Sequence, residues 1–358
     1  MVFNLSFIVP LLAIIVPLAD KPSPGSAEST GAKTQADVLA TGTSNTAPMP
    51  AGPADGNATQ DPGSAWTLRY RFEPGQQLRY QSEQKMTLEA HVGENRRVDV
   101  SQVRQVRLFT VKTVESSGAG TLAMQFEKVW MQRQVDDEAA VEFDSTMKAS
   151  EIPEVYRGVA HSLRGNAPTF RLTSTGKAVQ ETQMKGNESQ VRPAVVESPV
   201  ESDGLGQKEI QPVSATTAES TKSKDPGSFL MLLPENPVRP GDSWKEEFPL
   251  TVRGSQELNL QVVVLRTYRL ESVTGDIATV TFRSSVRTPI RSSAVRSQLI
   301  QATPSGQFQL DMKRGLMISR EYRYSETVIG ALGAESLLTS IGNQKETLLD
   351  SASAAPEN

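Results

Sequence analysis

Apolar and polar residues alternate with a period of two along most of the chain, which is the pattern of β-strands with one buried face. In the first half of the chain, the alternation predicts strands at 67–72, 77–90, 97–115, 121–134 and 168–179. In the second of these strands, the positions predicted to face inward are Leu78, Tyr80, Met86 and Leu88. The alternation therefore indicates a mainly antiparallel β structure.

The predicted strand at 121–134 contains an irregularity in its phase. Met124, Phe126 and Trp130 share one phase and are expected to face inward. Lys128 has the same phase, so strict alternation would also bury its charge, which is costly without a partner. A β-bulge adds one residue to a strand and shifts the phase beyond it. We therefore expect a bulge near Lys128.

The second half of the chain shows the same alternation. It predicts strands at 244–253, 257–272, 276–288, 293–302, 305–312 and 315–328. Before them, 229–233 is a short apolar run that ends at Pro234, and we expect one helical turn or a buried strap there. The segment 334–349 could be a strand or a helix, because the spacing of its apolar residues does not distinguish the two.

One segment, 151–164, has a helical pattern. Its apolar residues recur at intervals of three and four, which places them on one face of a helix. They are Ile152, Val155, Tyr156, Val159, Ala160 and Leu163. Ser150 is the predicted N-cap, and Gly165 is the predicted end. We expect this helix to lie against one face of the first sheet and to cover apolar side chains.

Three sequence elements occur twice in the same order: a Pro-Gly turn before an aromatic strand, a hairpin rich in Val and Thr, and Phe-x-Leu followed by a glycine. They lie at 74–80, 110–129 and 170–176, and again at 240–244, 262–286 and 308–315. The repetition indicates a duplicated β unit. The predicted fold is mainly β, with two similar antiparallel units, at 66–180 and 228–349, in a curved sheet or half-barrel. One or two short helices are expected on the sheet faces.

The remaining segments lack the composition of a folded core. Residues 1–27 contain an apolar run that is short for a membrane span, and they are predicted to be a signal peptide. An uncleaved membrane anchor is the alternative, because no Lys or Arg precedes the run. We expect disorder in a tether at 28–65, a linker at 181–227 and a tail at 350–358. These features predict an exported protein of the periplasm, cell envelope or extracellular space.

Composition restricts the chemistry that the chain can perform. Its 358 residues carry a formal net charge of −4, so no global positive field favours nucleic acid. The absence of cysteine excludes disulfides, thiolate metal sites and cysteine nucleophiles. His91 and His161 are too few for a His-rich zinc site, and no P-loop, dinucleotide-binding or zinc-protease motif occurs. We therefore expect no cofactor, no metal site and no catalytic residue.

Two charged clusters are candidate binding sites. The acidic run 136–138 lacks the glycine and the ligand spacing of an EF-hand loop, so we expect an exposed hairpin tip there. Arg283, Arg287 and Arg291 could form a strip that binds an anion, such as a lipid headgroup or an acidic glycan of the cell envelope. The simpler interpretation is that these arginines lie on outer strand faces, where charge prevents aggregation.

The phrase Leu-Pro-Glu-Asn-Pro-Val-Arg-Pro-Gly-Asp-Ser-Trp at 233–244, with Gly-x-Phe-x-Leu and a further glycine at 306–315, resembles a known group. It is similar to an uncharacterised family of exported, two-repeat β proteins of planctomycete-type bacteria, a domain of unknown function. The resemblance covers 66–345 without the linker. It implies no activity and no functional residues. By fold, it suggests a likeness to the half-barrel sheets of periplasmic lipoprotein carriers, which says little about function.

Three classes of function fit these observations. The first is a non-catalytic envelope or extracellular protein that acts by binding or structural spacing. The second is a carrier of a lipid or other apolar ligand, held between a curved sheet and a covering helix. The third is an enzyme whose site the sequence does not reveal. A cavity beneath the 151–164 helix would favour the carrier, and a filled core would favour the first class.

Overall fold

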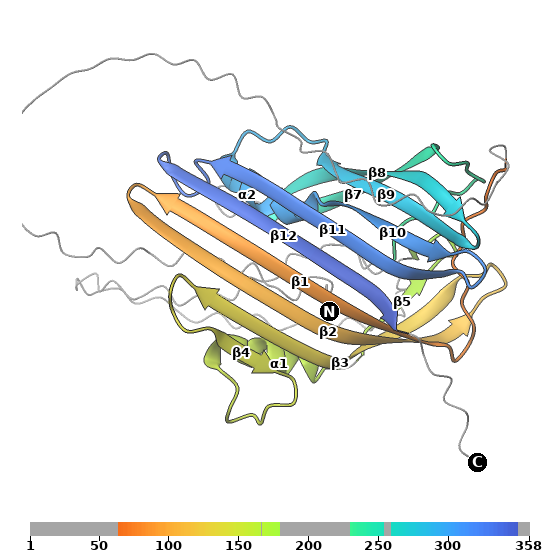
Figure 1. Ribbon diagram of the computed structural model, residues 1–358, viewed down its shortest axis with the longest axis horizontal. Helices are drawn as coiled ribbons and strands as arrows, with labels where there is room; N and C mark the ends of the chain where they lie inside the picture. Colours follow the sequence, from red (N-terminus) through yellow and green to blue (C-terminus); the bar gives the residue numbers. More distant parts are fainter. Residues whose placement is uncertain (1–63, 166, 180–229, 254–258, 350–358) are drawn as a thin grey trace, which may run out of the picture. The chain divides into compact units, whose positions relative to one another are not determined.

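The computed structural model describes residues 64–165, 167–179, 230–253 and 259–349. These residues form one open antiparallel sheet of 12 strands, in the order β6-β5-β3-β2-β1-β12-β11-β10-β9-β8-β7, with β4 pairing with β3 (Figure 1). The strands are Gln77–Val92 (β1), Asn95–Val114 (β2), Gly120–Val135 (β3), Val141–Asp144 (β4), Thr169–Leu172 (β5), Ala178–Val179 (β6), Ser243–Arg253 (β7), Asn259–Thr274 (β8), Ile277–Val286 (β9), Ser305–Asp311 (β10), Leu316–Ile329 (β11) and Ser336–Leu349 (β12). The expectation of a mainly antiparallel β fold is confirmed.

Both halves of the chain contribute to this single sheet, which is continuous where β1 pairs with β12. In each half, a Pro-Gly turn is followed by three long strands, a short helix, a Phe-x-Leu strand and a glycine turn, and the first half has the additional short strand β4 before its helix. The strands also neighbour one another in the same order, β1-β2-β3-β5-β6 in the first half and β7-β8-β9-β10-β11 in the second. The last strand, β12, lies between the two series.

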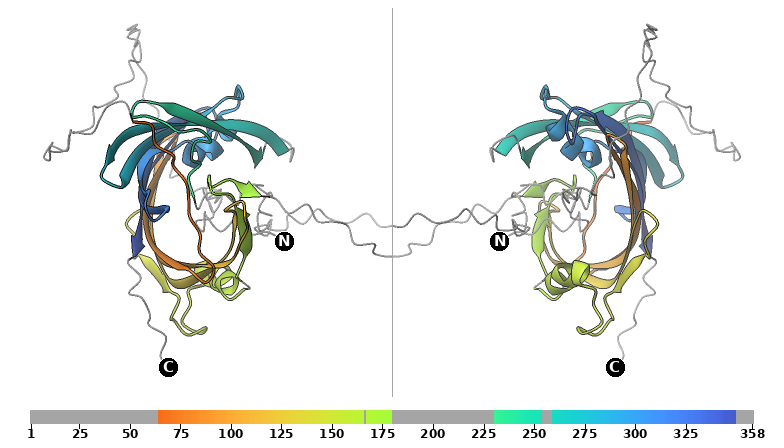
Figure 2. Two further views of the ribbon diagram at one scale, coloured as in Figure 1. Left: turned by 90° about the vertical axis from the view of Figure 1, so that its right-hand side faces the viewer. Right: turned by 90° about the vertical axis from the view of Figure 1, so that its left-hand side faces the viewer.

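The sheet has one buried face and one exposed face, because side chains alternate along its strands. Tyr80 of β1 is 1% exposed, whereas the next residue, Gln81, is exposed. We call the face that carries Tyr80 the inner face and the opposite one the outer face. Figure 2 shows the sheet curving around the inner face. There, Tyr80 and Phe109 from the first half share one core with Tyr268 and Phe308 from the second.

The positions predicted to face inward in β1 lie on the inner face. Leu78, Tyr80 and Met86 are buried, and Leu88 is half-buried. Their phase follows directly from the alternation in the sequence.

Two extended segments pack on the inner face, and we call 66–73 the first strap and 230–238 the second strap (Figure 2). A bridge between Trp66 and Val238 joins them. The Tyr70 hydroxyl donates a hydrogen bond to the backbone oxygen of Met231, at 2.8 Å. Both straps bury apolar side chains in the core, so among the described residues they cover part of the inner face.

The predicted strand at 67–72 is therefore wrong, although the alternation behind it is real. Leu68, Tyr70 and Phe72 are buried, but the strap backbone forms no ladder. Its amide groups bond to turns instead, because the N–H of Tyr70 donates to Ser174 and that of Arg71 to Gly315. The apolar run at 229–233 is a buried strap over its described residues, 230–233.

The repeated glycines hold the first strap against the sheet. Gly176 and Gly315 both adopt positive φ, 82° and 67°, which glycine tolerates best. A Cβ at Gly176 would lie 2.7 Å from the Tyr70 ring, and one at Gly315 would lie 2.5 Å from the backbone nitrogen of Arg71. Close approach of the strap thus explains the glycine that follows each Phe-x-Leu element.

The predicted helix at 151–164 is shorter than expected. A 3-10 turn at Glu154–Tyr156 leads into α1, Arg157–Leu163. Ser150 is not its N-cap, because Pro153 interrupts the segment and the helical turns begin after it. Tyr156 packs on Phe143 of β4, with ring centroids 5.7 Å apart, and burial raises its pKa to about 12. The turn before the helix thus covers an apolar side chain of the sheet, as predicted for the segment, and α1 itself buries Ala160.

The predicted strand at 293–302 is also wrong. This segment forms α2, Ser293–Leu299, followed by a 3-10 turn at Ile300–Ala302. The Ser292 side chain caps α2 by accepting a hydrogen bond from the Val295 backbone. Val295 and Leu299, four residues apart, are buried on one helical face against Val252 and Val262. The segment 334–349, left open between strand and helix, contains the strand β12.

Four of the predicted segments lie outside the described residues: the export signal or anchor at 1–27, the tether at 28–65 except for residues 64 and 65, the linker at 181–227 and the tail at 350–358. These expectations stay predictions. None of the helices in the described ranges is long and apolar enough to cross a membrane.

Candidate binding site

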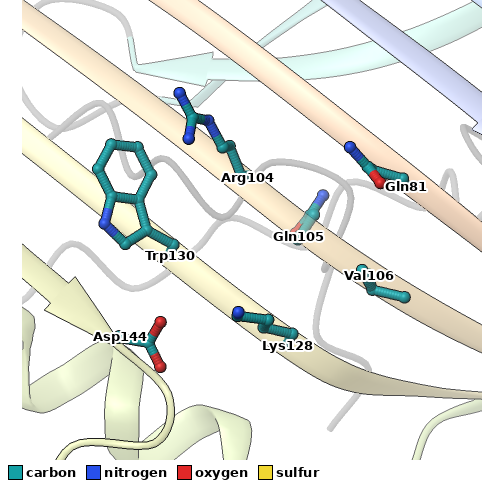
Figure 3. Close-up of a pocket in the computed structure, with 7 residues that line it drawn as sticks. All are labelled: Gln81, Arg104, Gln105, Val106, Lys128, Trp130 and Asp144. Atoms are coloured by element: carbon teal, nitrogen blue, oxygen red, sulfur yellow. The ribbon is translucent and has the colours of Figure 1, made fainter.

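A pocket of about 300 Å³ lies on the outer face, over β1, β2 and β3 and beside the end of β4 (Figure 3). Its lining includes six residues with the outer-face phase, namely two cations, one carboxylate, one amide, one aromatic ring and one aliphatic side chain, together with Gln105, which has the inner-face phase. These residues are Gln81, Arg104, Gln105, Val106, Lys128, Trp130 and Asp144. The pocket is open to solvent.

The register of the sheet places three of these residues in one row. Trp130 of β3 lies opposite Arg104 of β2 on one side and opposite Asp144 of β4 on the other. The Arg104 guanidinium lies over the Trp130 ring, 4.8 Å from its centroid, in a cation–π contact. This contact fixes the guanidinium beside the indole.

A second row, two residues further along β2, crosses β1, β2 and β3. Val106 of β2 lies opposite Gln81 of β1 and opposite Lys128 of β3. Because Gln81 and Lys128 are exposed and Val106 is half-buried, an aliphatic side chain lies between an amide and an ammonium group.

A β-bulge places Lys128 and Trp130 on the outer face. The register between β2 and β3 shifts between Val106 and Arg107, so that Glu127 has no opposite residue. Phe126 before the bulge packs on the inner core, whereas Lys128 after it is exposed. The predicted bulge near Lys128 is thus confirmed. The predicted inward orientation of Trp130 is wrong for the same reason, because the bulge reverses its phase too.

Hydrogen bonds hold Asp144 ionised at the edge of the pocket. Its Oδ1 accepts from the Thr146 hydroxyl at 2.6 Å and from the Thr146 backbone N–H at 2.8 Å. These bonds, with a smaller contribution from the positive charge of Lys128, lower the pKa of Asp144. The turn after β4 is held to β3 as well, since the Ser145 backbone N–H donates to the oxygen of Val129.

The pocket offers recognition groups rather than a reactive constellation. It has one carboxylate and no histidine, serine or second acid, so it lacks the paired acid and base of hydrolytic sites. Across the described residues, no group of three His, Cys, Asp or Glu side chains could hold a metal ion. The aromatic ring, the Arg104 guanidinium held beside it, the Lys128 ammonium and the Gln81 amide are suited to binding a polar ligand.

The predicted anion-binding arginines lie in the second half of the sheet. Arg283, on β9, and Arg291, between β9 and α2, are exposed. Arg287 pairs with Glu247 of β7 at 2.5 Å, with both side chains at least half exposed. An anion-binding role for this strip stays a prediction.

The remaining candidates lie apart from the pocket. His91, near the end of β1, interacts with Glu89 at 2.9 Å, and His161 is exposed on α1. The acidic run 136–138 forms the exposed turn between β3 and β4, where Asp136 accepts a hydrogen bond from the Val98 backbone.

A second charged cluster lies on the inner face, where it links the two halves of the sheet. Arg107 of β2 and Arg320 of β11 both donate to the carboxylate of Glu346 of β12, the latter at 2.5 Å. Their side chains are 3%, 7% and 1% exposed, respectively. Burial alone would lower the pKa of Arg320, but Glu346 and its other neighbours raise it, so the guanidinium stays charged. The cluster is enclosed by the core, so we assign it a structural role.

The fold and the pocket define a class: an open antiparallel β protein whose inner face packs against two straps and whose outer face carries a mixed-charge pocket. The chain belongs to a family of unknown function (DUF6263), whose model matches residues 117–317. Membership of a family of unknown function agrees with the resemblance seen in the sequence.

Comparisons with other proteins add little to the family assignment. No curated protein matches the chain. Among solved structures, one described as lipid–protein interactions in lipovitellin matches at 12% identity and a TM-score of 0.40, covering 80% of this chain. The chain spans 27% of that protein's length. A likeness this distant carries no argument about function.

Proposed function

We propose that the protein is an exported, non-catalytic β protein that acts by binding a ligand at the outer-face pocket. The observation that supports this most directly is the contrast between the two faces of the sheet. The inner face is occupied by the two straps, while the outer face presents aromatic, cationic and amide groups to solvent. The pocket is a site at which a ligand can bind without displacing part of the core.

The same contrast makes a carrier of apolar ligands the weaker candidate. A carrier needs a lined cavity between its sheet and the elements that cover it. Next to α1, however, Tyr156 packs on Phe143 with its ring tilted by 31°, and both rings are buried. Further along the inner face, the straps bury Leu68, Tyr70 and Met231 in the shared core. These contacts support binding at the surface rather than transport within the sheet.

We further infer that the fold arose by duplication of one β unit. The matching order of elements and of strand neighbours in the two halves supports this, as do the glycines at positive φ that contact the first strap. The proposal of export rests on the apolar leader alone. N-terminal sequencing of protein from the native host should find a mature chain that begins near residue 28. Intact Met1 on membrane-bound protein would instead indicate an anchor.

Native mass spectrometry of the protein purified from its own host tests the proposed function. We expect a polar ligand that is retained by wild-type protein and lost from Trp130→Ala, which removes a half-buried side chain of the pocket. A copurified lipid that Trp130→Ala retains would support the carrier instead. Wild-type protein that copurifies with no ligand and binds no envelope component afterwards would contradict the proposal.

A further inference from the structure

We propose that the outer-face pocket binds a sugar residue that carries a carboxylate, as found in acidic glycans. This inference rests on the proposed binding function and specifies the ligand. It is drawn from the unmatched charges of the pocket, the groups beside them and the size of the site.

The first observation is that neither cation of the pocket forms a salt bridge among the described residues, although Lys128 lies near enough to Asp144 to lower its pKa. Some other basic residues on the outer face of this half are paired, as Arg79 is with Glu127 at 2.9 Å and Arg171 with Glu115 at 2.5 Å, whereas Lys85 and Lys112 form no ion pair in the described part of the chain. Within the described residues, no ion pair involves Arg104 or Lys128. Two free cations on neighbouring strands attract an anionic ligand, and a guanidinium binds a carboxylate through two parallel hydrogen bonds.

The second observation is that the pocket also contains a carboxylate. Asp144 is kept ionised by Thr146 and would repel a ligand that offered only negative charge. A ligand that also carries hydroxyl groups can donate hydrogen bonds to Asp144 while its acidic group binds Arg104 and Lys128. The Gln81 amide can donate and accept further hydrogen bonds. This combination favours an acidic sugar over a fatty acid or a bare inorganic anion.

The third observation is the size and lining of the pocket. Its volume of about 300 Å³ is at the lower end of the range for small-molecule sites, roughly 300–1,000 Å³, and suits one or two rings rather than a long acyl chain. Trp130 and Val106 supply apolar surface for the C–H groups of a ring. The Arg104 side chain is held on the indole before any ligand arrives, which lowers the entropy that binding must overcome.

Isothermal titration calorimetry with an oligogalacturonate, on the full chain, tests this inference. We expect saturable binding that weakens as salt is raised, because exposed charges are screened. A neutral oligosaccharide of the same length should bind the wild-type protein at least about tenfold more weakly, because it lacks the carboxylate. Oligogalacturonate should bind Arg104→Gln and Lys128→Gln at least about tenfold more weakly than wild type, because each substitution removes one charge-assisted hydrogen bond. Lys85→Gln is the matched control, because Lys85 is an exposed cation of β1 outside the pocket, and it should bind like wild type.

The outcomes separate this inference from the proposed function. Equal binding of neutral and acidic oligosaccharides, with no loss in Lys128→Gln, would overturn the acidic ligand and leave the pocket as a binding site. Oligogalacturonate binding that Trp130→Ala, Arg104→Gln and Lys128→Gln all leave unchanged would place the ligand elsewhere and overturn the inference. Each variant should first be shown to melt like wild type, so that altered binding reports the pocket rather than unfolding.

Discussion

Glu346 provides the most sensitive test of how the two halves of the sheet are held together. It is the single carboxylate between two buried guanidiniums, so the cluster with Arg107 and Arg320 has a formal charge of +1. Glu346→Gln keeps the shape of the side chain but removes its charge. Two buried cations would then face each other without compensation, which is costly where solvent cannot screen them.

The expected destabilisation follows from the burial of all three side chains. Removing one partner from a buried ion pair typically costs about 3–5 kcal/mol, compared with a total stability of about 5–15 kcal/mol for a typical domain. At about 2–4 °C of melting temperature per kcal/mol for a domain of this size, Tm should fall by about 6–20 °C. Thermal and urea unfolding followed by circular dichroism would measure the change.

Two further variants make this experiment decisive. Lys345→Gln alters the neighbouring residue on the exposed outer face and should change stability by no more than about 0.5 kcal/mol. Replacing Arg107, Arg320 and Glu346 together with apolar residues of similar size should recover much of the loss, because no charge remains uncompensated. If Glu346→Gln unfolds at the wild-type temperature, the cluster does not hold the halves together and the reasoning is refuted.

Three other perturbations test the core, the sheet and the pocket edge. Trp244→Ala should lower the free energy of unfolding by about 3 kcal/mol, because the indole stacks on Tyr268 with ring centroids 5.5 Å apart and donates a hydrogen bond to the Leu232 backbone oxygen at 2.8 Å. Lys245 is exposed, so Lys245→Ala should melt like wild type. Gly306→Ala should lower stability by about 1–3 kcal/mol in urea melts, since its Cβ would overlap the backbone of β11; an unchanged midpoint would contradict this packing. The pKa of Asp144 is lower in the folded protein than the ordinary value of about 3.9. The hydrogen bonds of its carboxylate therefore stabilise the fold fully above about pH 3.9, and this stabilisation is lost as the pH falls through the lowered pKa of the folded state. Thr146→Val should therefore destabilise the protein at pH 7 and have little effect near pH 2, and equal effects at both would exclude this linkage.

Much of the sheet could be predicted from the sequence because alternation is a local signal. The bulge near Lys128 followed from one misplaced charge, and it lies where expected. Trp130 was misassigned because a phase shift acts on every later residue of a strand, not only on the lysine next to the bulge. Extending the shift by two residues would have placed an aromatic ring on the outer face and indicated the pocket.

Other features depend on contacts between distant parts of the chain, which a local pattern does not contain. The first strap alternates like a strand, but whether its backbone pairs in a ladder is decided by turns near Ser174 and Gly315. Charged residues at Arg107 and Glu346 would be assigned to a solvated face, and their burial depends on partners 239 positions apart. The second short helix was missed because Val295 and Leu299 give only one helical interval in a stretch of seven residues.

The position of β12 has a consequence for the order in which the protein can fold. The last strand is central in the sheet, between the first strand and β11, so a growing chain contains two incomplete sheets with unpaired edges. Its long-range pairing with β1 favours slow folding, and the two halves cannot join before β12 has been synthesised. In an exported protein this delay would be useful, because a chain that folds late stays unfolded long enough to pass through a translocation channel. A chain cut short before β12 would expose both edges to other molecules and should aggregate rather than fold as a smaller sheet.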